Sequence, residues 1–202
     1  ERVCRQLREW QATNVPLLRI AVNVAPANFQ QADFHRHVEA TLGRYGIPPG
    51  LIELELTEGS LMENTDSVQD TLRKLKLTGV RLAIDDFGTG HSCLSYLRQF
   101  PIDVLKIDRS FVMDLGRNAH GTAICGLVLS IARSLNLEVV AEGVENETQL
   151  AFLTKYRCGS VQGQYFSMPV RPEELPAIFE SHGTKAAKHP VRDPQVTAAV
   201  SG

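Results

Sequence analysis

The sequence predicts an α/β protein built on a parallel sheet, and three observations support this fold class. Short apolar stretches rich in branched residues alternate with helical patterns along the chain. The predicted strands recur about every 25–35 residues, which is the spacing of right-handed βαβ units. Several strands are apolar at almost every position, as is typical of strands that are buried on both faces.

Three strands and three helices are predicted in the first half of the chain. Val3, Leu7 and Trp10 mark one face of the first helix. The second helix is stopped by Gly46 and the turn that follows it. The strands are 17–24, 51–58 and 80–86, and the helices are 1–13, 29–45 and 67–77.

The same alternation continues in the second half of the chain. The predicted strands are 103–108, 137–143 and 159–163, and the helices are 92–99, 122–135, 148–155 and 172–180. The last twenty residues, from Gly183, show no periodicity. We therefore expect one domain over residues 1–182 and a flexible C-terminal tail over residues 183–202.

Composition excludes several classes of protein. The 21 basic and 23 acidic side chains leave a net charge of −2, so we expect no nucleic-acid partner, and any phosphate must be bound locally. Apolar runs fall short of the roughly 18 residues of a membrane span, and we expect no membrane segment in this chain. The four cysteines form no C-x-x-C pair, which argues against structural zinc or disulfides and favours a reducing cytoplasm.

Polar residues stand where each predicted strand ends. In a parallel sheet the carboxyl ends of all strands open on one face, so these side chains are predicted to converge. For Asp86 or Asp108 alone, capping a helix or forming a turn is an equally good explanation. The residues concerned are Asn23, Glu55, Glu58, Asp85, Asp86, Lys106, Asp108, Glu142 and Gln162.

The residue types indicate what such a site could do. Carboxylates and amides offer hard oxygen ligands, which suit Mg²⁺ or Mn²⁺ and not zinc. Clustered acids repel one another unless cations neutralise them. The adjacent Asp85 and Asp86 could serve two ions, an arrangement that activates water toward a phosphodiester. Lys106 could stabilise negative charge beside that water, or form an ion pair with one of the acids, and both roles are compatible.

The loop that begins at Asp86 contains Gly88 and Gly90 before a helix. Two glycines so close together could cradle a phosphate on backbone N–H groups. A mobile catalytic loop or a simple tight turn explains them equally well.

At this point several motifs can be compared with a known family. The segments ELTE at 55–58, DDFGTG at 85–90, FPIDVLKIDRSF at 100–111, AEGVE at 141–145 and QGQYF at 162–166 closely resemble the EAL domain family, and NVAP at 23–26 is loosely similar to it. The match runs from residue 1 to about residue 180. The resemblance implies a TIM-like (β/α)8 barrel with one antiparallel strand. It also implies a bacterial phosphodiesterase that linearises cyclic di-GMP to pGpG with two Mg²⁺ or Mn²⁺ ions.

The resemblance implies metal ligands by position. Asn23, Glu55 and Asp85 match ligands of the first ion. Asp85 and Asp86, helped by Glu142, match the ligands that are shared with the second ion or belong to it.

The resemblance also implies catalytic and substrate-binding residues. Lys106 matches the lysine that holds or activates the attacking water, and Glu142 and Gln162 are expected beside it. Glu58 matches a glutamate that anchors the loop 86–97, which links the metals to a dimer interface. Gln162, Asp108 and Pro169 are expected at the substrate, with Pro169 near a guanine.

The chain departs from the family pattern at its start. The Glu-Ala-Leu motif, whose glutamate is a metal ligand in the family, would lie upstream of Glu1. A closed eight-stranded barrel takes about 250 residues, so we expect a barrel truncated at its N-terminus to about six βα units. The alternative to a phosphodiesterase is then a catalytically inactive module that binds cyclic di-GMP or another protein. A generic metal-dependent barrel enzyme fits the spacing less well.

The resemblance finally implies partners and a setting. We expect a homodimer in the bacterial cytoplasm. We also expect an upstream sensory or cyclic di-GMP synthase domain in a longer protein, which could itself be membrane-anchored.

Overall fold

The computed structural model describes residues 1–13, 15, 18–62, 65–89, 97–178 and 198–199. Strands and helices alternate along these residues, as the sequence predicts. The strands are β1 (Ile20–Asn23), β2 (Ile52–Thr57), β3 (Arg81–Phe87), β4 (Val104–Ile107), β5 (Glu138–Ala141), β6 (Ser160–Val161) and β7 (Ala198–Ala199). The α-helices are α1 (Arg2–Ala12), α2 (Pro26–Phe29), α3 (Phe34–Tyr45), α4 (Glu58–Met62), α5 (Thr65–Thr78), α7 (Arg109–Met113), α8 (Ala119–Ser134) and α9 (Glu147–Lys155), and the 3₁₀ turns are Pro49–Leu51 and Pro172–Glu174.

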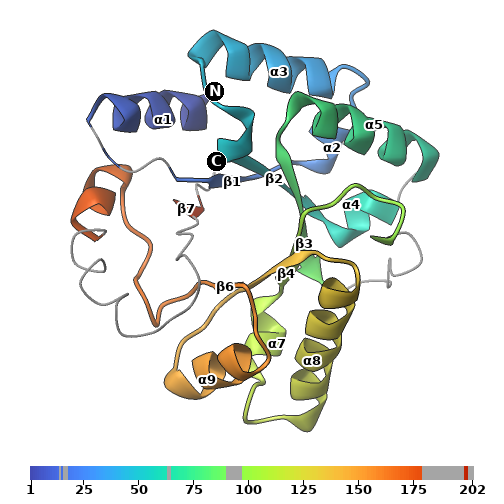
Figure 1. The fold of residues 1–202 in the computed structure, drawn as a ribbon, viewed down its shortest axis with the longest axis vertical. Helices are drawn as coiled ribbons and strands as arrows, with labels where there is room; N and C mark the ends of the chain where they lie inside the picture. Colours follow the sequence, from blue (N-terminus) through green and yellow to red (C-terminus); the bar gives the residue numbers. More distant parts are fainter. Residues whose placement is uncertain (14, 16–17, 63–64, 90–96, 179–197, 200–202) are drawn as a thin grey trace.

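The strands form one sheet in which β1 to β6 lie in chain order. The order is β6-β5-β4-β3-β2-β1-β7, and every pairing is parallel. Figure 1 shows that the sheet curls and that the helices lie on its outer side. The α/β class and the parallel sheet are therefore confirmed, and the curl is that of a TIM-like barrel with six sequential strands in the described part of the chain.

Some boundaries differ from the sequence-based prediction. The single helix expected over 29–45 is wrong at its start, because Pro26 begins the separate short helix α2 and α3 begins only after Asp33. Strand β6 is shorter than expected. The last predicted helix begins as a 3₁₀ turn and continues as α-helix to residue 178, where the described range ends. Residues 92–96 of the helix expected at 92–99 and most of the loop 86–97 lie outside the described residues, and of the rest of that helix only Leu97 is helical, followed by a turn.

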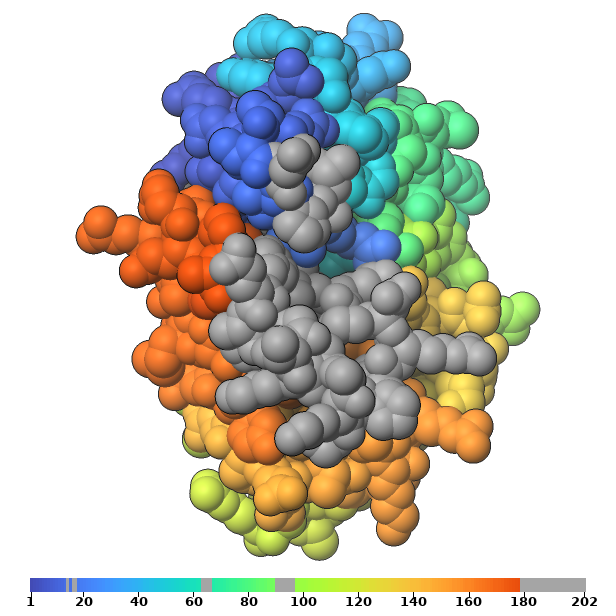
Figure 2. Space-filling view, turned by 60° about the vertical axis from the view of Figure 1, so that its left-hand side comes forward, coloured from blue at the N-terminus to red at the C-terminus, as the bar shows by residue number. Residues whose placement is uncertain are grey.

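Of the predicted tail, the structure describes Ala198 and Ala199. They pair in parallel with Ile20 and Ala21 of β1, a contact that the sequence did not predict. Figures 1 and 2 both place the preceding described segment, residues 172–178, beside the N-terminal part of the chain. The curl thus brings the two ends of the described chain to one side. Within the described ranges, no helix has the length and apolar character needed to cross a membrane.

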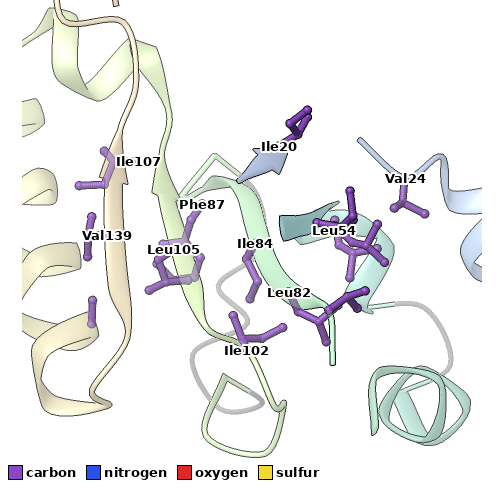
Figure 3. Packing of buried hydrophobic residues seen from close by; sticks show 14 of the residues in the cluster. Ile20, Val24, Leu54, Leu82, Ile84, Phe87, Ile102, Leu105, Ile107 and Val139 are labelled. Atoms are coloured by element: carbon purple, nitrogen blue, oxygen red, sulfur yellow. The ribbon is translucent and has the colours of Figure 1, made fainter. Parts of the chain in front are cut away.

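Alternation along each strand divides the apolar side chains between two faces. Leu82 and Ile84 of β3 and Leu105 of β4 belong to the large core beneath the helices, where Figure 3 shows them side by side on neighbouring strands. Ala83, which lies between Leu82 and Ile84, points the other way. It packs with Val104 and Val140 in a small separate cluster on the inner face of the curl.

This small apolar cluster separates two layers of charge on the inner face. Toward the N-terminal ends of the strands lie Glu53, Arg81 and Glu138, with Arg19 beside them. Toward the C-terminal ends lie Glu55, Asp85, Lys106 and Glu142. The fold therefore places the predicted site residues at the end of the sheet where α/β barrels hold their active sites.

Candidate active site

Lys106 lies at the centre of the predicted site. Its Nζ atom is 2.5 Å from Glu55 Oε1, 2.6 Å from Glu142 Oε1 and 3.1 Å from Asp85 Oδ1. The Lys106 side chain is only 5% exposed and that of Glu55 only 2%. The ion-pair role considered for Lys106 is therefore confirmed, with three acids and not one: Glu55 of β2, Asp85 of β3 and Glu142 directly after β5.

Strand register explains why these residues meet. Asn23 pairs directly with Glu55, and Thr57 pairs with Asp85 on the next strand. Directly paired residues of parallel strands project to the same face, so Asn23 and Glu55 share one side of the sheet. The Asn23 side chain is exposed at the mouth of the site, whereas Glu55 is buried below it.

The end of β3 is irregular, and this irregularity affects Asp85 and Asp86. Consecutive strand residues ordinarily face opposite sides. Here the pairing with β4 shifts between Ile84 and Phe87, and Asp86 has a left-handed backbone with φ of 55°. The Asp86 amide donates to Asp85 Oδ1 at 3.1 Å. Irregular strand ends of this kind can re-aim side chains next to active sites. The Asp86 carboxyl lies close enough to Asp85, Asp108 and Lys106 to interact with them electrostatically.

Burial sets the protonation of the cluster. Burial raises the pKa of Glu55 to about 7, although Lys106 opposes the shift. Burial likewise raises the pKa of Glu142 above its ordinary value, and burial together with Asp85 and Asp108 raises the pKa of Asp86. For Lys106, burial alone would lower the pKa, but Glu142 and Glu55 outweigh burial and raise it. Lys106 is therefore a permanent positive charge beside Glu55 and Glu142, whose ionisation burial opposes.

Gln162, which directly follows β6, completes the cluster. Its Nε2 atom donates to Glu142 Oε1 at 2.9 Å, and its backbone N–H donates to Ala141 O at 2.9 Å. Glu142 thus receives Lys106 and Gln162 on the same carboxylate oxygen.

Three further predicted residues lie around this cluster. Glu58, at the start of α4, is buried, and its Oε2 atom accepts a hydrogen bond from Gly88 N at 3.0 Å, where the loop 86–97 begins. Asp108 caps α7 by accepting hydrogen bonds from the backbone N–H and hydroxyl of Ser110, as the capping explanation required. Pro169 is exposed on the segment that follows β6. The substrate-binding roles of Asp108 and Pro169 stay predictions.

The donor set fits divalent cations. Four carboxylates face one ammonium group here, which leaves an excess of negative charge that cations would neutralise. Glu55 Oε1 is buried and, despite its closeness to Lys106, receives no hydrogen bond of acceptable geometry. Among the described side chains, no three histidine, cysteine, aspartate or glutamate residues have the arrangement of a formed metal site. The ammonium group of Lys106 lies between Glu55, Asp85 and Glu142, which would have to move closer together to coordinate one ion.

Sequence reasoning missed two charged residues beside the site. Arg109 follows β4 and Glu145 follows β5, and they form an ion pair with Arg109 Nη2 2.5 Å from Glu145 Oε1. Both residues fall within segments already singled out for resemblance. Their opposite charges just beyond adjacent strands were the signal that could have paired them.

Comparison with known proteins identifies the family of the chain. Residues 1–169 match the EAL domain family. The cyclic di-GMP phosphodiesterase NbdA of Pseudomonas aeruginosa is 41% identical over 186 residues, which cover 92% of this chain and 24% of NbdA. The PaMucR phosphodiesterase in complex with c-di-GMP has 40% identity and a TM-score of 0.81, covering 85% of this chain and 70% of that structure. Klebsiella pneumoniae BlrP1 in its manganese and cy-diGMP complex has 29% identity and a TM-score of 0.73, covering 82% of this chain and 43% of BlrP1.

The extent of these matches defines what they establish. The chain spans about a quarter of the length of the curated relatives that it matches. Its own match to the family covers the whole candidate site, from Asn23 to Gln162. By sequence, fold and placement of these residues, the chain belongs to the EAL domain family.

Proposed function

We propose that this chain is the catalytic part of a phosphodiesterase that hydrolyses cyclic di-GMP to linear pGpG with Mg²⁺ or Mn²⁺. The observation that carries the proposal is the burial of Lys106 among Glu55, Asp85 and Glu142 at the carboxyl ends of the strands. Family membership supports the same reaction, since NbdA is a cyclic di-GMP phosphodiesterase and BlrP1 was solved with manganese and cy-diGMP.

The proposed metal ligands are oxygen donors at the mouth of the site. Two divalent ions bound there would lower the pKa of a water molecule and neutralise the phosphodiester. Their ligands would be Asn23, Glu55, Asp85, Asp86 and Glu142, which supply hard oxygen atoms only.

The chain's own residues would then handle charge and protons. Because its pKa is raised, Lys106 stays protonated and stabilises negative charge that develops on the attacked phosphate. Because Lys106 keeps its proton, Glu142, whose pKa is raised by burial, is better placed than Lys106 to accept a proton. Gln162 holds the Glu142 carboxylate through the 2.9 Å hydrogen bond.

A direct assay tests the proposal. The 202-residue chain is incubated with cyclic di-GMP and either Mg²⁺, Mn²⁺ or EDTA, and linear pGpG is measured by chromatography. Cyclic di-AMP serves as the matched control substrate. We expect metal-dependent release of pGpG and none with EDTA. Binding of cyclic di-GMP without turnover would support the inactive binding module instead, and absence of both would overturn the proposal.

We also propose the wider setting that the family suggests. The relatives are several times longer than this chain, and one of them, MucR, is a bifunctional diguanylate cyclase and cyclic di-GMP phosphodiesterase. An upstream sensory or synthase domain, a homodimer and a cytoplasmic location for this domain remain parts of the proposal. Light scattering of the purified chain would test the dimer.

A further inference from the structure

The loop from Glu142 to Asn146 carries the carboxylate that the site depends on. It joins β5 to α9, and Glu142 lies at its first position. The Glu142 backbone N–H donates to Ile107 O of β4 at 3.1 Å. At the other end, Gln149 Oε1 accepts from Glu145 N at 2.7 Å and from Asn146 N at 3.1 Å as part of the capping box of α9. Gly143, between these anchors, has φ of 71° and no side chain of its own to fix it.

One face of this loop is covered by Arg109. A Cβ atom added to Gly143 would lie 2.2 Å from Arg109 Cγ, so the aliphatic stem of Arg109 rests directly on Gly143. The guanidinium group continues over the loop to Glu145, where Nη2 lies 2.5 Å from Oε1. Arg109 therefore spans the loop from Gly143 to Glu145. We call this pair the Arg109–Glu145 clamp.

The opposite face of the loop is held by the segment that follows β6. Val144 N donates to Gln162 O at 3.0 Å, and Tyr165 N donates to Val144 O at 3.0 Å. A Cβ atom on Gly163 would lie 2.2 Å from Val144 O, so the two backbones are in direct contact. The loop is thus gripped between Arg109 on one side and the Gln162 segment on the other.

We propose that Arg109 and Glu145 are positioning residues that hold the Glu142 carboxylate between Lys106 and Gln162. The expected effect of this positioning on catalysis rests on the proposed function. Without the clamp, Gly143 could rotate, and Glu142 would leave the position in which its Oε1 atom is 2.6 Å from Lys106 Nζ and 2.9 Å from Gln162 Nε2. In this proposal the clamp acts on the reaction only through Glu142.

The variants separate packing from charge. Arg109→Ala removes stem and charge, Arg109→Met keeps the stem over Gly143, and Arg109→Lys keeps stem and charge. Glu145→Gln removes the partner. Three measurements are made on each: Mn²⁺ binding followed by electron paramagnetic resonance, kcat and KM for cyclic di-GMP, and hydrogen exchange of the loop amides.

Partners that orient a functional group commonly contribute about 10- to 100-fold to metal affinity or activity. For Arg109→Ala we therefore expect Mn²⁺ affinity and kcat to fall by about tenfold, with KM nearly unchanged and faster exchange of Val144 and Glu145. Arg109→Lys should recover part of the loss. The double variant Arg109→Ala with Glu145→Gln should lose no more Mn²⁺ affinity or kcat than Arg109→Ala alone, because both substitutions remove the same interaction.

The matched control is Lys74→Ala on α5. Lys74 and Asp70 form an ion pair of the same length, 2.5 Å, with side chains 43% and 61% exposed. Losing this pair should leave Mn²⁺ affinity, kcat and loop exchange as in the wild type, since exposed pairs contribute at most about 1 kcal/mol to stability.

Each outcome bears on the inference separately from the proposed function. Unchanged Mn²⁺ affinity and loop exchange in Arg109→Ala would overturn the clamp, even if its melting temperature fell. Weakened Mn²⁺ binding in a protein whose wild type hydrolyses no cyclic di-GMP would support the clamp and overturn the proposed function. A wild type that binds no Mn²⁺ would overturn both.

Discussion

Lys106 faces the inside of the curled sheet from β4 and is surrounded by three acids. At such inward positions a barrel commonly holds a branched apolar side chain. Its ammonium group is almost completely buried, which is costly unless opposite charges compensate. Glu55, Asp85 and Glu142 supply that compensation, and the excess of acid charge raises the pKa of Lys106. The same residue therefore compensates the acids of the site and would supply a fixed positive charge in the proposed reaction.

Lys106→Met should reduce turnover far more than substrate binding. Loss of one preorganised charge in an active site typically lowers kcat by about 100- to 1000-fold. We expect a loss of that size in pGpG formation, with a much smaller change in the dissociation constant of cyclic di-GMP measured by calorimetry. Metal-dependent turnover at the wild-type rate would remove Lys106 from the mechanism.

Lys76→Met is the matched control for that substitution. Lys76 Nζ lies 2.8 Å from both carboxylate oxygens of Asp103, away from the mouth of the site. The control should lower thermal stability while the kcat of the folded protein stays unchanged. A parallel loss of turnover in both variants would point to a general effect of removing a lysine that is paired with an acid.

At the scale of elements, close backbone contacts and shared anchors set the positions of the strand ends. The β5–α9 loop contacts the segment after β6 at Gly163, where the lack of a side chain lets the two backbones touch. This contact brings Gln162 to Glu142. On the opposite end of the sheet, Asp103 joins three elements. Its carboxylate binds Lys76 of α5 and accepts from Leu82 N of β3, while its backbone precedes β4.

Gly163→Ala should disturb both stability and the site. The new methyl group would lie 2.2 Å from Val144 O and 2.3 Å from Val144 N, so the loop must move. Overpacking of this kind costs about 1–3 kcal/mol, which urea unfolding would detect, and kcat should fall because Glu142 moves with the loop. Gly43→Ala on α3 is the control, since nothing lies within 4 Å of its added methyl group. That control should stabilise the protein by about 0.5–1 kcal/mol.

Asp103→Asn should lower stability without touching the site. The substitution removes the ion pair with Lys76, and its amide keeps only one oxygen for Leu82 N. Hydrogen bonds to charged groups contribute about 1.5–3 kcal/mol, and partial exposure of this pair should place the loss near the lower end. An unchanged urea midpoint would show that the Lys76–Asp103 pair does not connect α5 to the sheet energetically.

At the scale of the whole molecule, the inner face of the curled sheet is built in three layers. A charged layer of Glu53, Arg81, Glu138 and Arg19 closes one end. The small apolar cluster of Ala83, Val104 and Val140 follows, and the candidate site occupies the other end. This layering keeps the structural ion pairs apart from the acids of the site, so the two can be altered independently.

The pH dependence of stability should report on the first layer. Burial raises the pKa of Glu53 above its ordinary value of 4.5, although Arg81 and Arg19 oppose the shift. The folded protein therefore holds this proton more tightly than the unfolded chain, and the unfolding free energy falls as the pH rises above 4.5 toward the folded-state pKa. Glu53→Gln should lack this contribution, so its unfolding free energy should fall less over that interval. Equal slopes for the two proteins in urea unfolding would contradict the shift.

Much of the site could be predicted from the order of strands alone. Residues that end parallel strands converge whatever the helices between them do, and Glu55, Asp85, Lys106, Glu142 and Gln162 do meet. The Arg109–Glu145 clamp and the first charged layer were not predictable in this way. Their partners lie 28 to 119 residues apart in the chain and meet through strand register and stagger.

The amino-acid sequence by itself determined the α/β class, the parallel order of β1 to β6, the face on which the polar residues gather and the family of the chain. Local periodicity and the convergence of strand ends carry that information. Only the tertiary structure decided that Lys106 faces three acids, that the pairing of β3 shifts between Ile84 and Phe87, and that Arg109 covers Gly143. Such contacts depend on ångström-scale register between distant segments, which residue spacing along a chain does not encode.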